Sequence, residues 1–187
     1  MDPFQSNGAK VKSGDVMPSI QIRLLQPSDI QPIAAAFAKL GWDKPADQYV
    51  RYLTEQDAGD RVVLVAACDG VFTGYLTILW ESPYPFFWKD GIPEIVDFNV
   101  LPRFRRKGIG SLLMDEAEKR IAERSPITGI GVGLTPDYGA AQILYVKRGY
   151  VPDGRGLVKD GQPLPYGNQV ILDDSLTLYF LKSLGSL

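Results

Sequence analysis

The chain has 187 residues, 45% of them hydrophobic, and its 20 basic and 22 acidic side chains give a formal net charge of −2. These values suit a single globular domain with a sizeable core, and they give no reason to expect nucleic acid as a partner. Histidine is absent. Its absence excludes Ser-His-Asp and Cys-His catalysis, histidine-based zinc sites and an imidazole general base.

The single cysteine, Cys68, ends an apolar run that starts at Val62. One cysteine cannot form an internal disulfide, which is typical of a reducing compartment. We therefore expect a cytoplasmic protein in which this thiol is a core residue rather than a nucleophile. No apolar run approaches the roughly 18 residues of a membrane span, so no membrane partner is expected. The polar residues 1–18 predict a disordered tail ahead of one domain over 19–187.

The first half of the chain predicts a strand, two helices and a hairpin. Apolar residues alternate in the strands and recur at helical spacing in the helices, which Gly41 and Gly59 end. The pair Asp69-Gly70 is a typical hairpin turn, so the strands that flank it should be antiparallel neighbours. The predicted elements are a strand at 20–24, helices at 28–40 and 45–59, and strands at 62–67 and 71–80.

The second half predicts alternating strands and helices, with loops at 81–93 and 151–168. The firmest helix starts at Ile109 and has one apolar stripe that ends at Ile121. The other predicted elements are strands at 95–100, 127–135 and 176–181 and a helix at 139–148.

Two of these strands have unusual faces. In the strand 95–100, alternation places Val96, Phe98 and Val100 on one face and Asp97 and Asn99 on the other. The strand 127–135 has glycine at every second position, so one of its faces has no side chains. That pattern indicates either a weakly held edge or a place where another group approaches the backbone closely. The three glycines are Gly129, Gly131 and Gly133.

A cationic turn precedes the helix that starts at Ile109. Four of the five residues from Arg103 to Lys107 are basic, and Gly108 follows at once. Glycine lets the backbone approach an anion, and a helix N-terminus presents free N–H groups and a positive dipole end. A tight loop with solvated charges is the alternative, but we predict a phosphate site. Its residues would be Arg105, Gly108 and Gly110, with backbone donors from Arg106, Lys107, Ile109 and Ser111.

Two motifs resemble the GNAT superfamily of N-acetyltransferases, and the resemblance covers residues 20 to 181. The segment from Val100 to Gly110 resembles the Arg/Gln-x-x-Gly-x-Gly/Ala loop with which that family grips the pyrophosphate of acetyl-CoA. The segment from Ala141 to Tyr150 is similar to the family's Ala-x-x-Leu-Tyr-x-x-x-Gly-Phe segment. This chain has Tyr138 where the family often has Asn, so Tyr138 takes that place among the cofactor contacts.

The resemblance implies an α/β (α+β) fold: a mixed, mainly antiparallel twisted sheet flanked by helices, with splayed central strands. The backbone of Phe98, Asn99 and Val100 would hydrogen-bond the pantetheine arm of acetyl-CoA in the manner of an added strand. The glycine face of 127–135 would form the other wall of that opening.

The implied function is acetyl transfer from acetyl-CoA to a primary amine, without a metal. We expect a small-molecule acceptor and direct transfer in a ternary complex, because the only cysteine lies in a predicted strand. Acetylation of a peptide stays open. So do two other functions: a non-catalytic CoA or acetyl-CoA sensor, and an enzyme that holds another phosphorylated ligand.

Acetyl transfer requires a proton acceptor and a proton donor. An alkyl amine with a pKa near 10.4 is neutral in only about one molecule in 2,500 at pH 7, so a nearby carboxylate is wanted. Asp97 is the first candidate for this base because its strand adjoins the cationic turn, and Glu81 is the second. By resemblance, Tyr145 would donate a hydrogen bond to the departing thiolate.

The acceptor site is the least defined part of the prediction. Aromatic residues in the loop 81–93 could line a pocket with Tyr166, which would suit an apolar group beside an amine. They could equally belong to the core or to a contact in a homodimer. The candidate acceptor residues are Tyr84, Phe87, Trp88 and Tyr166.

Overall fold

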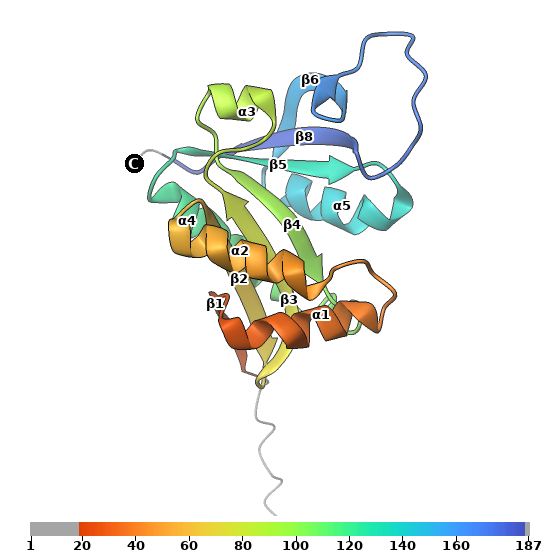
Figure 1. The fold of residues 1–187 in the computed structure, drawn as a ribbon. Coiled ribbons are helices and arrows are strands. Elements are labelled where there is room, and N and C mark those ends of the chain that lie inside the picture. Colours follow the sequence, from red (N-terminus) through yellow and green to blue (C-terminus); the bar gives the residue numbers. More distant parts are fainter. Residues whose placement is uncertain (1–18, 186–187) are drawn as a thin grey trace, which may run out of the picture.

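The computed structural model describes residues 19–185, so the tail predicted at 1–18 lies outside the described residues. Those residues form one eight-stranded sheet with helices on both faces (Figure 1). The strands are β1 (Ile20–Leu24), β2 (Arg61–Cys68), β3 (Val71–Leu79), β4 (Glu94–Val100), β5 (Ile127–Gly133), β6 (Val151–Lys159), β7 (Gln162–Pro163) and β8 (Leu176–Ser183). The α-helices are α1 (Ile30–Ala38), α2 (Ala46–Ala58), α3 (Pro85–Lys89), α4 (Ile109–Ala122) and α5 (Gly139–Lys147).

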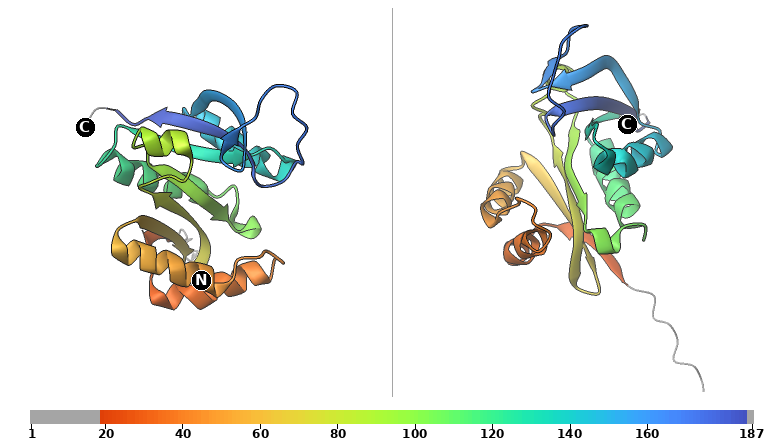
Figure 2. Two further views of the ribbon diagram at one scale, coloured as in Figure 1. Left: turned by 45° about the horizontal axis from the view of Figure 1, so that its top comes forward. Right: turned by 90° about the vertical axis from the view of Figure 1, so that its right-hand side faces the viewer.

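The strand order is β1-β2-β3-β4-β5-β8-β6-β7, and every neighbouring pair is antiparallel except β4 and β5. Figure 2 shows α1 and α2 on one face of the sheet and α4 and α5 on the other. The predicted mixed, mainly antiparallel sheet flanked by helices is therefore confirmed.

Each face of the sheet has its own apolar core. On the α4 and α5 face, Leu113 and Ile121 pack with Ile95 and Ile130 from the central strands. On the α1 and α2 face, Phe37 and Tyr49 pack with Tyr75 of β3, and all three are buried. The central strands are thus covered on both sides, which fixes the position of their backbone.

Two segments predicted as loops contain regular structure. The short helix α3 lies within 81–93 and begins at Pro85, a residue well suited to the first turn of a helix. The segment after Tyr150 forms β6, which pairs with β8 in two pieces separated by a register shift. Gly154 and Gly156 lie between these pieces and have positive φ. The glycines of this segment therefore mark a kink within a strand rather than a loop.

The central strands β4 and β5 separate after a short contact. They pair in parallel only at Glu94–Gly129 and Ile95–Ile130, and beyond these pairs they diverge (Figure 1). The splayed central strands expected from the family resemblance are present. From Val96 to Val100, the edge of β4 that faces β5 has no strand partner among residues 19–185.

A β-bulge interrupts β4 just where the two strands separate. Asp97 has φ +51°, and the pairing with β3 skips from Thr77–Val96 to Tyr75–Asn99. An extra residue in one strand reverses the side-chain alternation beyond it. The predicted face is therefore wrong for Val96, which pairs with Thr77 on the α2 face, whereas Phe98 and Val100 pack toward α4.

Aromatic rings of this chain fill the glycine face of β5. A Cβ atom built on Gly129 would lie 2.1 Å from the Phe87 ring, and one on Gly133 would lie 2.5 Å from the Tyr138 ring. A Cβ atom on Gly131 would lie 3.0 Å from the Tyr179 ring. Close approach to the backbone is thus confirmed, and β5 is not an edge strand. The expectation that these glycines form a bare wall of the opening is wrong, because side chains cover them.

We predict that Gly129→Ala destabilises the protein by about 3 kcal/mol, because the new methyl group would overlap the buried Phe87 ring. Urea unfolding measures the loss. Gly139→Ala is the matched control: nothing lies within 4 Å of its Cβ position, and alanine favours a helix. Adding Phe87→Ala to Gly129→Ala should cost less than the sum of the single changes. Equal stability of the Gly129 and Gly139 variants would contradict this packing.

Candidate functional site

The candidate site is the opening between β4 and β5 together with the turn that follows β4. The chain leaves β4 at Val100, passes through a 3-10 helix at Pro102–Phe104 and enters α4 at Ile109. The unpaired edge of β4 therefore leads directly to the N-terminus of α4. Tyr145 from α5 and Asp97 from the bulge lie on opposite faces of β4 beside this opening.

The turn before α4 has the backbone geometry of an anion site. Arg106 has φ +59° and Gly108 has φ +81°, and Gly108 is the N-cap of the 14-residue helix. The Leu112 N–H donates to the Gly108 carbonyl. Within residues 19–185, no backbone acceptor pairs with the N–H groups of 106–111. Converging free N–H groups at the positive end of a helix dipole favour a phosphate.

Two residues predicted to bind phosphate, Arg105 and Lys107, have side chains that point in different directions. The Arg105 side chain folds back, and its Nε donates to the Val100 carbonyl at 3.0 Å, which keeps the guanidinium at the end of β4. The Lys107 side chain points instead toward the β2–β3 hairpin. Its Nζ lies 5.4 Å from the centre of the Phe104 ring, which also stacks with Arg103. Lys107 therefore offers the turn its backbone N–H rather than its ammonium group.

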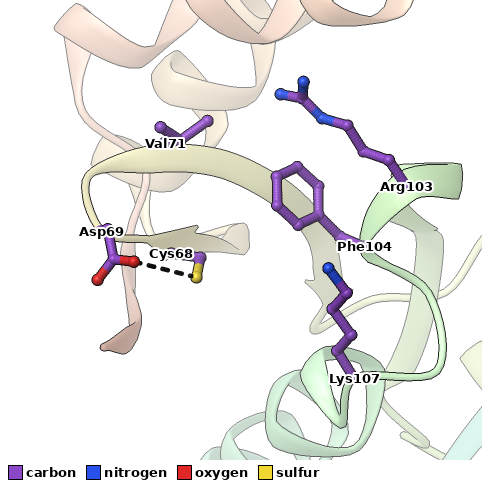
Figure 3. Close-up of a pocket in the computed structure, with 6 residues that line it drawn as sticks. All are labelled: Cys68, Asp69, Val71, Arg103, Phe104 and Lys107. Carbon is purple, nitrogen blue, oxygen red and sulfur yellow. Dashed lines mark hydrogen bonds between the residues drawn. The ribbon is translucent and has the colours of Figure 1, made fainter. Parts of the chain in front are cut away.

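A shallow hollow separates this cation pair from the hairpin. Figure 3 shows Arg103 and Lys107 on either side of Phe104, with Cys68, Asp69 and Val71 of the hairpin across the hollow. Cys68 is half-buried, with its Sγ 3.9 Å from Asp69 Oδ2, so it is less enclosed than its apolar run predicts. Strands β3 and β4 lie between Cys68 and the opening.

Tyr145 is 4% exposed and packs beside Phe98 of β4, with ring centroids 6.5 Å apart. Burial, together with the nearby Tyr138, raises the pKa of its phenol above the ordinary value, so the hydroxyl keeps its proton at neutral pH. Among residues 19–185 its hydroxyl has no hydrogen-bond partner, and it is not sealed from solvent. Tyr145 can therefore donate to a group that enters the opening.

Asp97 accepts hydrogen bonds from five side chains. Two oxygens of a carboxylate offer about four lone pairs, so these donors occupy its acceptor capacity. Lys44 also forms an ion pair with it. The donors are Lys44 Nζ at 2.6 Å, Gln48 Nε2 at 2.8 Å, Tyr52 Oη at 2.9 Å, Tyr75 Oη at 2.5 Å and Asn99 Nδ2 at 2.9 Å.

These contacts suit an anchor better than a proton acceptor. Lys44 and Gln48 belong to the loop before α2 and to α2 itself, so Asp97 ties the bulge of β4 to the helical layer. Burial and the nearby Asp97 charge raise the pKa of Tyr52 to about 12, so this neighbour stays a donor at neutral pH. The sequence placed Asp97 beside the cationic turn. The donors to Asp97 could not be predicted, because most of them lie far from it along the chain.

The structure does not bring Glu81 to the same place. Glu81 is exposed and follows β3, whose end pairs with the first residue of β4. The cationic turn follows the opposite end of β4. Glu81 therefore lies at the far end of the strand from the turn and outside the cluster around Asp97.

The four candidate acceptor residues do not line one pocket. Tyr84 and Phe87 are buried, and Tyr84 stacks on Tyr179 with ring centroids 3.7 Å apart. Trp88 is 64% exposed, and Tyr166 is fully exposed in the segment between β7 and β8. Aromatic content alone could not distinguish the two core residues from the two surface residues.

Tyr138, which stands where the family often has Asn, covers Gly133. Its hydroxyl donates to Asp174 Oδ1 at 3.1 Å, and burial raises its pKa to about 12. The ring therefore closes part of the glycine face at the wide end of the opening, where an amide would have left space.

A buried carboxyl group that the sequence did not single out is Glu94, the first residue of β4. It is 4% exposed, and its Oε2 accepts a hydrogen bond from Ser82. Burial raises the pKa of Glu94 to about 7, although the Ser82 bond lowers it. The sequence prediction began this strand at Ile95. Extending the alternation by one residue would have placed Glu94 opposite the apolar face.

The described part of the chain shows neither a cluster of metal ligands nor a membrane-spanning helix. Within residues 19–185, no three His, Cys, Asp or Glu side chains gather as a metal site would require. None of the helices in that range is long and apolar enough to cross a membrane.

Comparison with known proteins agrees with this geometry. The family model described as Acetyltransferase (GNAT) family matches residues 29–150, which include the bulge, the cationic turn, α4 and α5. A search of curated proteins found no match.

Several solved structures share the fold at low sequence identity. An N-acetyltransferase from Staphylococcus aureus is 18% identical, with a TM-score of 0.65, over 89% of this chain and 99% of that one. The protein yncA from Salmonella typhimurium, solved with its cofactor acetyl-CoA, is 19% identical, with a TM-score of 0.63, over 88% and 94%. A ribosomal-protein-alanine N-acetyltransferase from Brucella melitensis is 19% identical, with a TM-score of 0.65, over 87% and 99%.

We predict that Asp97→Asn destabilises the fold by about 3 kcal/mol. Asparagine tolerates the positive φ, but it removes the charge that Lys44 pairs with and turns one acceptor into a donor. Chemical denaturation measures the change. Asp160→Asn is the control, because Asp160 has the same φ of +51° in an exposed turn and should change stability by less than about 0.5 kcal/mol. Similar stability of both variants would show that the five contacts contribute little.

Proposed function

The chain belongs to the acetyltransferase (GNAT) family, and on that premise we propose that it is an acetyl-CoA-dependent N-acetyltransferase. Its acceptor is a primary amine, in the first instance that of a small molecule, and transfer is direct within a ternary complex. The observation that carries this proposal is the continuity between the unpaired edge of β4 and the N-terminus of α4.

The site has features that suit two parts of acetyl-CoA, the pyrophosphate and the pantetheine arm. The free N–H groups of 106–111 and the Arg105 guanidinium suit the pyrophosphate. The edge of β4 from Val96 to Val100 offers backbone groups to the extended pantetheine arm, as an added strand would pair. Both contacts use backbone groups that the bulge and the turn hold in position, and Arg105 adds one side chain to the pyrophosphate contact.

Direct transfer is supported by the cysteine position and by Tyr145. A covalent acetyl-enzyme would need a nucleophile at the opening, but Cys68 lies beyond β3 and β4. Tyr145 would donate its hydroxyl proton to the departing sulfur, since burial keeps that group protonated. The amine would attack from the other face of β4, where Asp97 and the α2 side chains gather.

One observation favours a second function. The carboxylate predicted as the base has all its acceptor sites engaged, and a non-catalytic CoA or acetyl-CoA sensor would need no base. Such a sensor would bind the cofactor without releasing CoA in the presence of any amine. Binding and turnover therefore have to be measured separately.

We predict saturable binding of acetyl-CoA to the wild type in a calorimetric titration. A variant with Arg105→Ala and Gly108→Asp should lose it, because the changes remove a guanidinium and place a carboxylate at the helix N-terminus in a strained left-handed conformation. Lys119→Ala, at the other end of the same helix, is the control and should bind as the wild type does. No binding by the wild type would overturn the acetyltransferase proposal and its sensor alternative together.

We predict that Tyr145→Phe lowers kcat for acetyl transfer about a hundredfold while the Kd for acetyl-CoA changes less than about twofold, since only the proton donor is lost. Thiol release over a panel of amines measures turnover. Tyr150→Phe is the control. The Tyr150 hydroxyl is buried without a hydrogen-bond partner among residues 19–185, so its removal should leave kcat unchanged. An unchanged kcat in Tyr145→Phe would remove the donor role.

A further inference from the structure

The side chain of Lys44 carries a primary amine to the opening. It belongs to the loop before α2, and its Nζ donates to Asp97 Oδ1 at 2.6 Å. Asp97 is the second residue beyond the last β4–β5 pair, Ile95–Ile130, so this ammonium group lies beside the point from which the strands diverge. The other lysines of residues 19–185 that form ion pairs do so with carboxylates outside β4.

This amine lies on the face of β4 from which the proposed acceptor would attack. Tyr145, the proposed proton donor, lies on the opposite face. Asp97 is close enough to the β5 side of the opening to act on it. Besides burial and the Asp174 charge, the charge of Asp97 raises the pKa of Tyr138, whose ring covers the last residue of β5. Lys44 and Asp97 thus border the opening from the side of α2.

The surroundings of the Lys44 ammonium group are those of a binding site for an alkylamine. Its Nζ lies 5.8 Å from the centre of the Phe37 ring and 5.8 Å from that of the Tyr75 ring, within the range of a cation–π contact. The Lys44 side chain is 18% exposed, so it remains accessible to a ligand. Two rings and one carboxylate would hold the ammonium group of an incoming acceptor, and here a residue of the chain itself fills that place.

The full acceptor shell of Asp97 excludes a new donor but not Lys44. An external amine would have to displace one of the five donors before it could give Asp97 a proton. Lys44 is already one of these donors, so its proton can move to Oδ1 along an existing hydrogen bond. The flexible four-carbon stem then lets the neutral nitrogen turn toward the opening. Lys44 is therefore better placed than a free amine to react at this carboxylate.

We propose that Lys44 is a self-acetylation site: with acetyl-CoA bound, the enzyme transfers the acetyl group to the Nζ of its own Lys44. The inference rests on the proposed acetyltransferase function, in which the pantetheine arm runs along the unpaired edge of β4 and its sulfur end lies near Val96. The product is a neutral amide, which can no longer form the ion pair with Asp97.

The transfer step balances in atoms and protons. The Lys44 nitrogen forms a bond to the thioester carbonyl carbon, and the carbon–sulfur bond breaks. The ammonium group loses two protons in all. The first passes to Asp97 before the attack and is released to water. The second is lost from the attacking nitrogen and replaces, through solvent, the proton that Tyr145 gives to the departing thiolate.

The test incubates the full chain with acetyl-CoA that carries an isotope-labelled acetyl group, and follows acetylation by mass spectrometry of the intact protein and its peptides. Unlabelled acetyl groups already present in the purified protein are counted separately. Lys44→Arg keeps a cation for Asp97 and the two rings but offers no amine, so it should fold and stay unmodified. Lys39→Arg is the matched control, because Lys39 is exposed at the end of α1.

Two further measurements complete the test. The variant with Arg105→Ala and Gly108→Asp shows whether acetylation depends on the cofactor site. Thermal unfolding checks that every variant folds.

We expect a single acetyl group per chain, on Lys44, added at least about tenfold faster than to any other lysine because this amine is held at the site. The rate should saturate with acetyl-CoA. Per molecule it should not depend on protein concentration, since transfer occurs within one chain. Lys39→Arg should behave as the wild type does, whereas Lys44→Arg and the cofactor-site variant should gain no more acetyl than the unfolded protein.

The possible failures can be told apart. A wild type that binds acetyl-CoA but carries no acetyl group on Lys44, labelled or unlabelled, would overturn this inference, and its turnover of external amines would then decide the proposed function. Equal acetylation of Lys44 in the cofactor-site variant, or a rate per molecule that rises with protein concentration, would also overturn the inference. A wild type that does not bind acetyl-CoA would overturn both proposals.

Discussion

The site depends on the clamp around Asp97. A positive φ at a non-glycine residue is costly, and here five donors from the loop before α2, α2, β3 and β4 itself hold the residue that adopts it. The bulge that results turns Phe98 and Val100 toward α4 and coincides with the point at which β4 leaves β5. The edge that could receive an extended ligand begins at this point, beyond the last β4–β5 pair at Ile95–Ile130.

The two faces of β4 have different chemistry. The α4 and α5 face is apolar and presents one tyrosine, Tyr145, whose environment keeps it protonated. The opposite face holds two carboxyl groups in unlike surroundings: Asp97 amid donors, and Glu94 amid aromatic rings with a single donor. Environments that separate two carboxyl groups in this way commonly divide their roles. Asp97 is held by five donors and anchors the bulge, whereas burial raises the pKa of Glu94 to about 7.

Much of this fold could be predicted because its signals are local. The stripe of α4, the hairpin turn at Asp69-Gly70 and the cationic turn each follow from a few adjacent residues. What could not be predicted depends on contacts distant in sequence. The bulge at Asp97 requires donors more than 40 residues away, and no local pattern shows that Phe87 fills the space above Gly129. Glu94 was missed because the predicted strand began one residue late, and element boundaries are the least certain part of such a pattern.

The aromatic rings above the β5 glycines also constrain how this sequence can change over time. Each ring and the glycine beneath it occupy one volume, so neither residue can be exchanged alone without a clash or a void. Phe87 with Gly129, and Tyr138 with Gly133, should therefore vary as pairs among descendants of this protein. A relative with a larger side chain at position 129 should carry a smaller one at position 87. Sequence change in α3 is therefore constrained by β5, a strand with which α3 forms no backbone pairing.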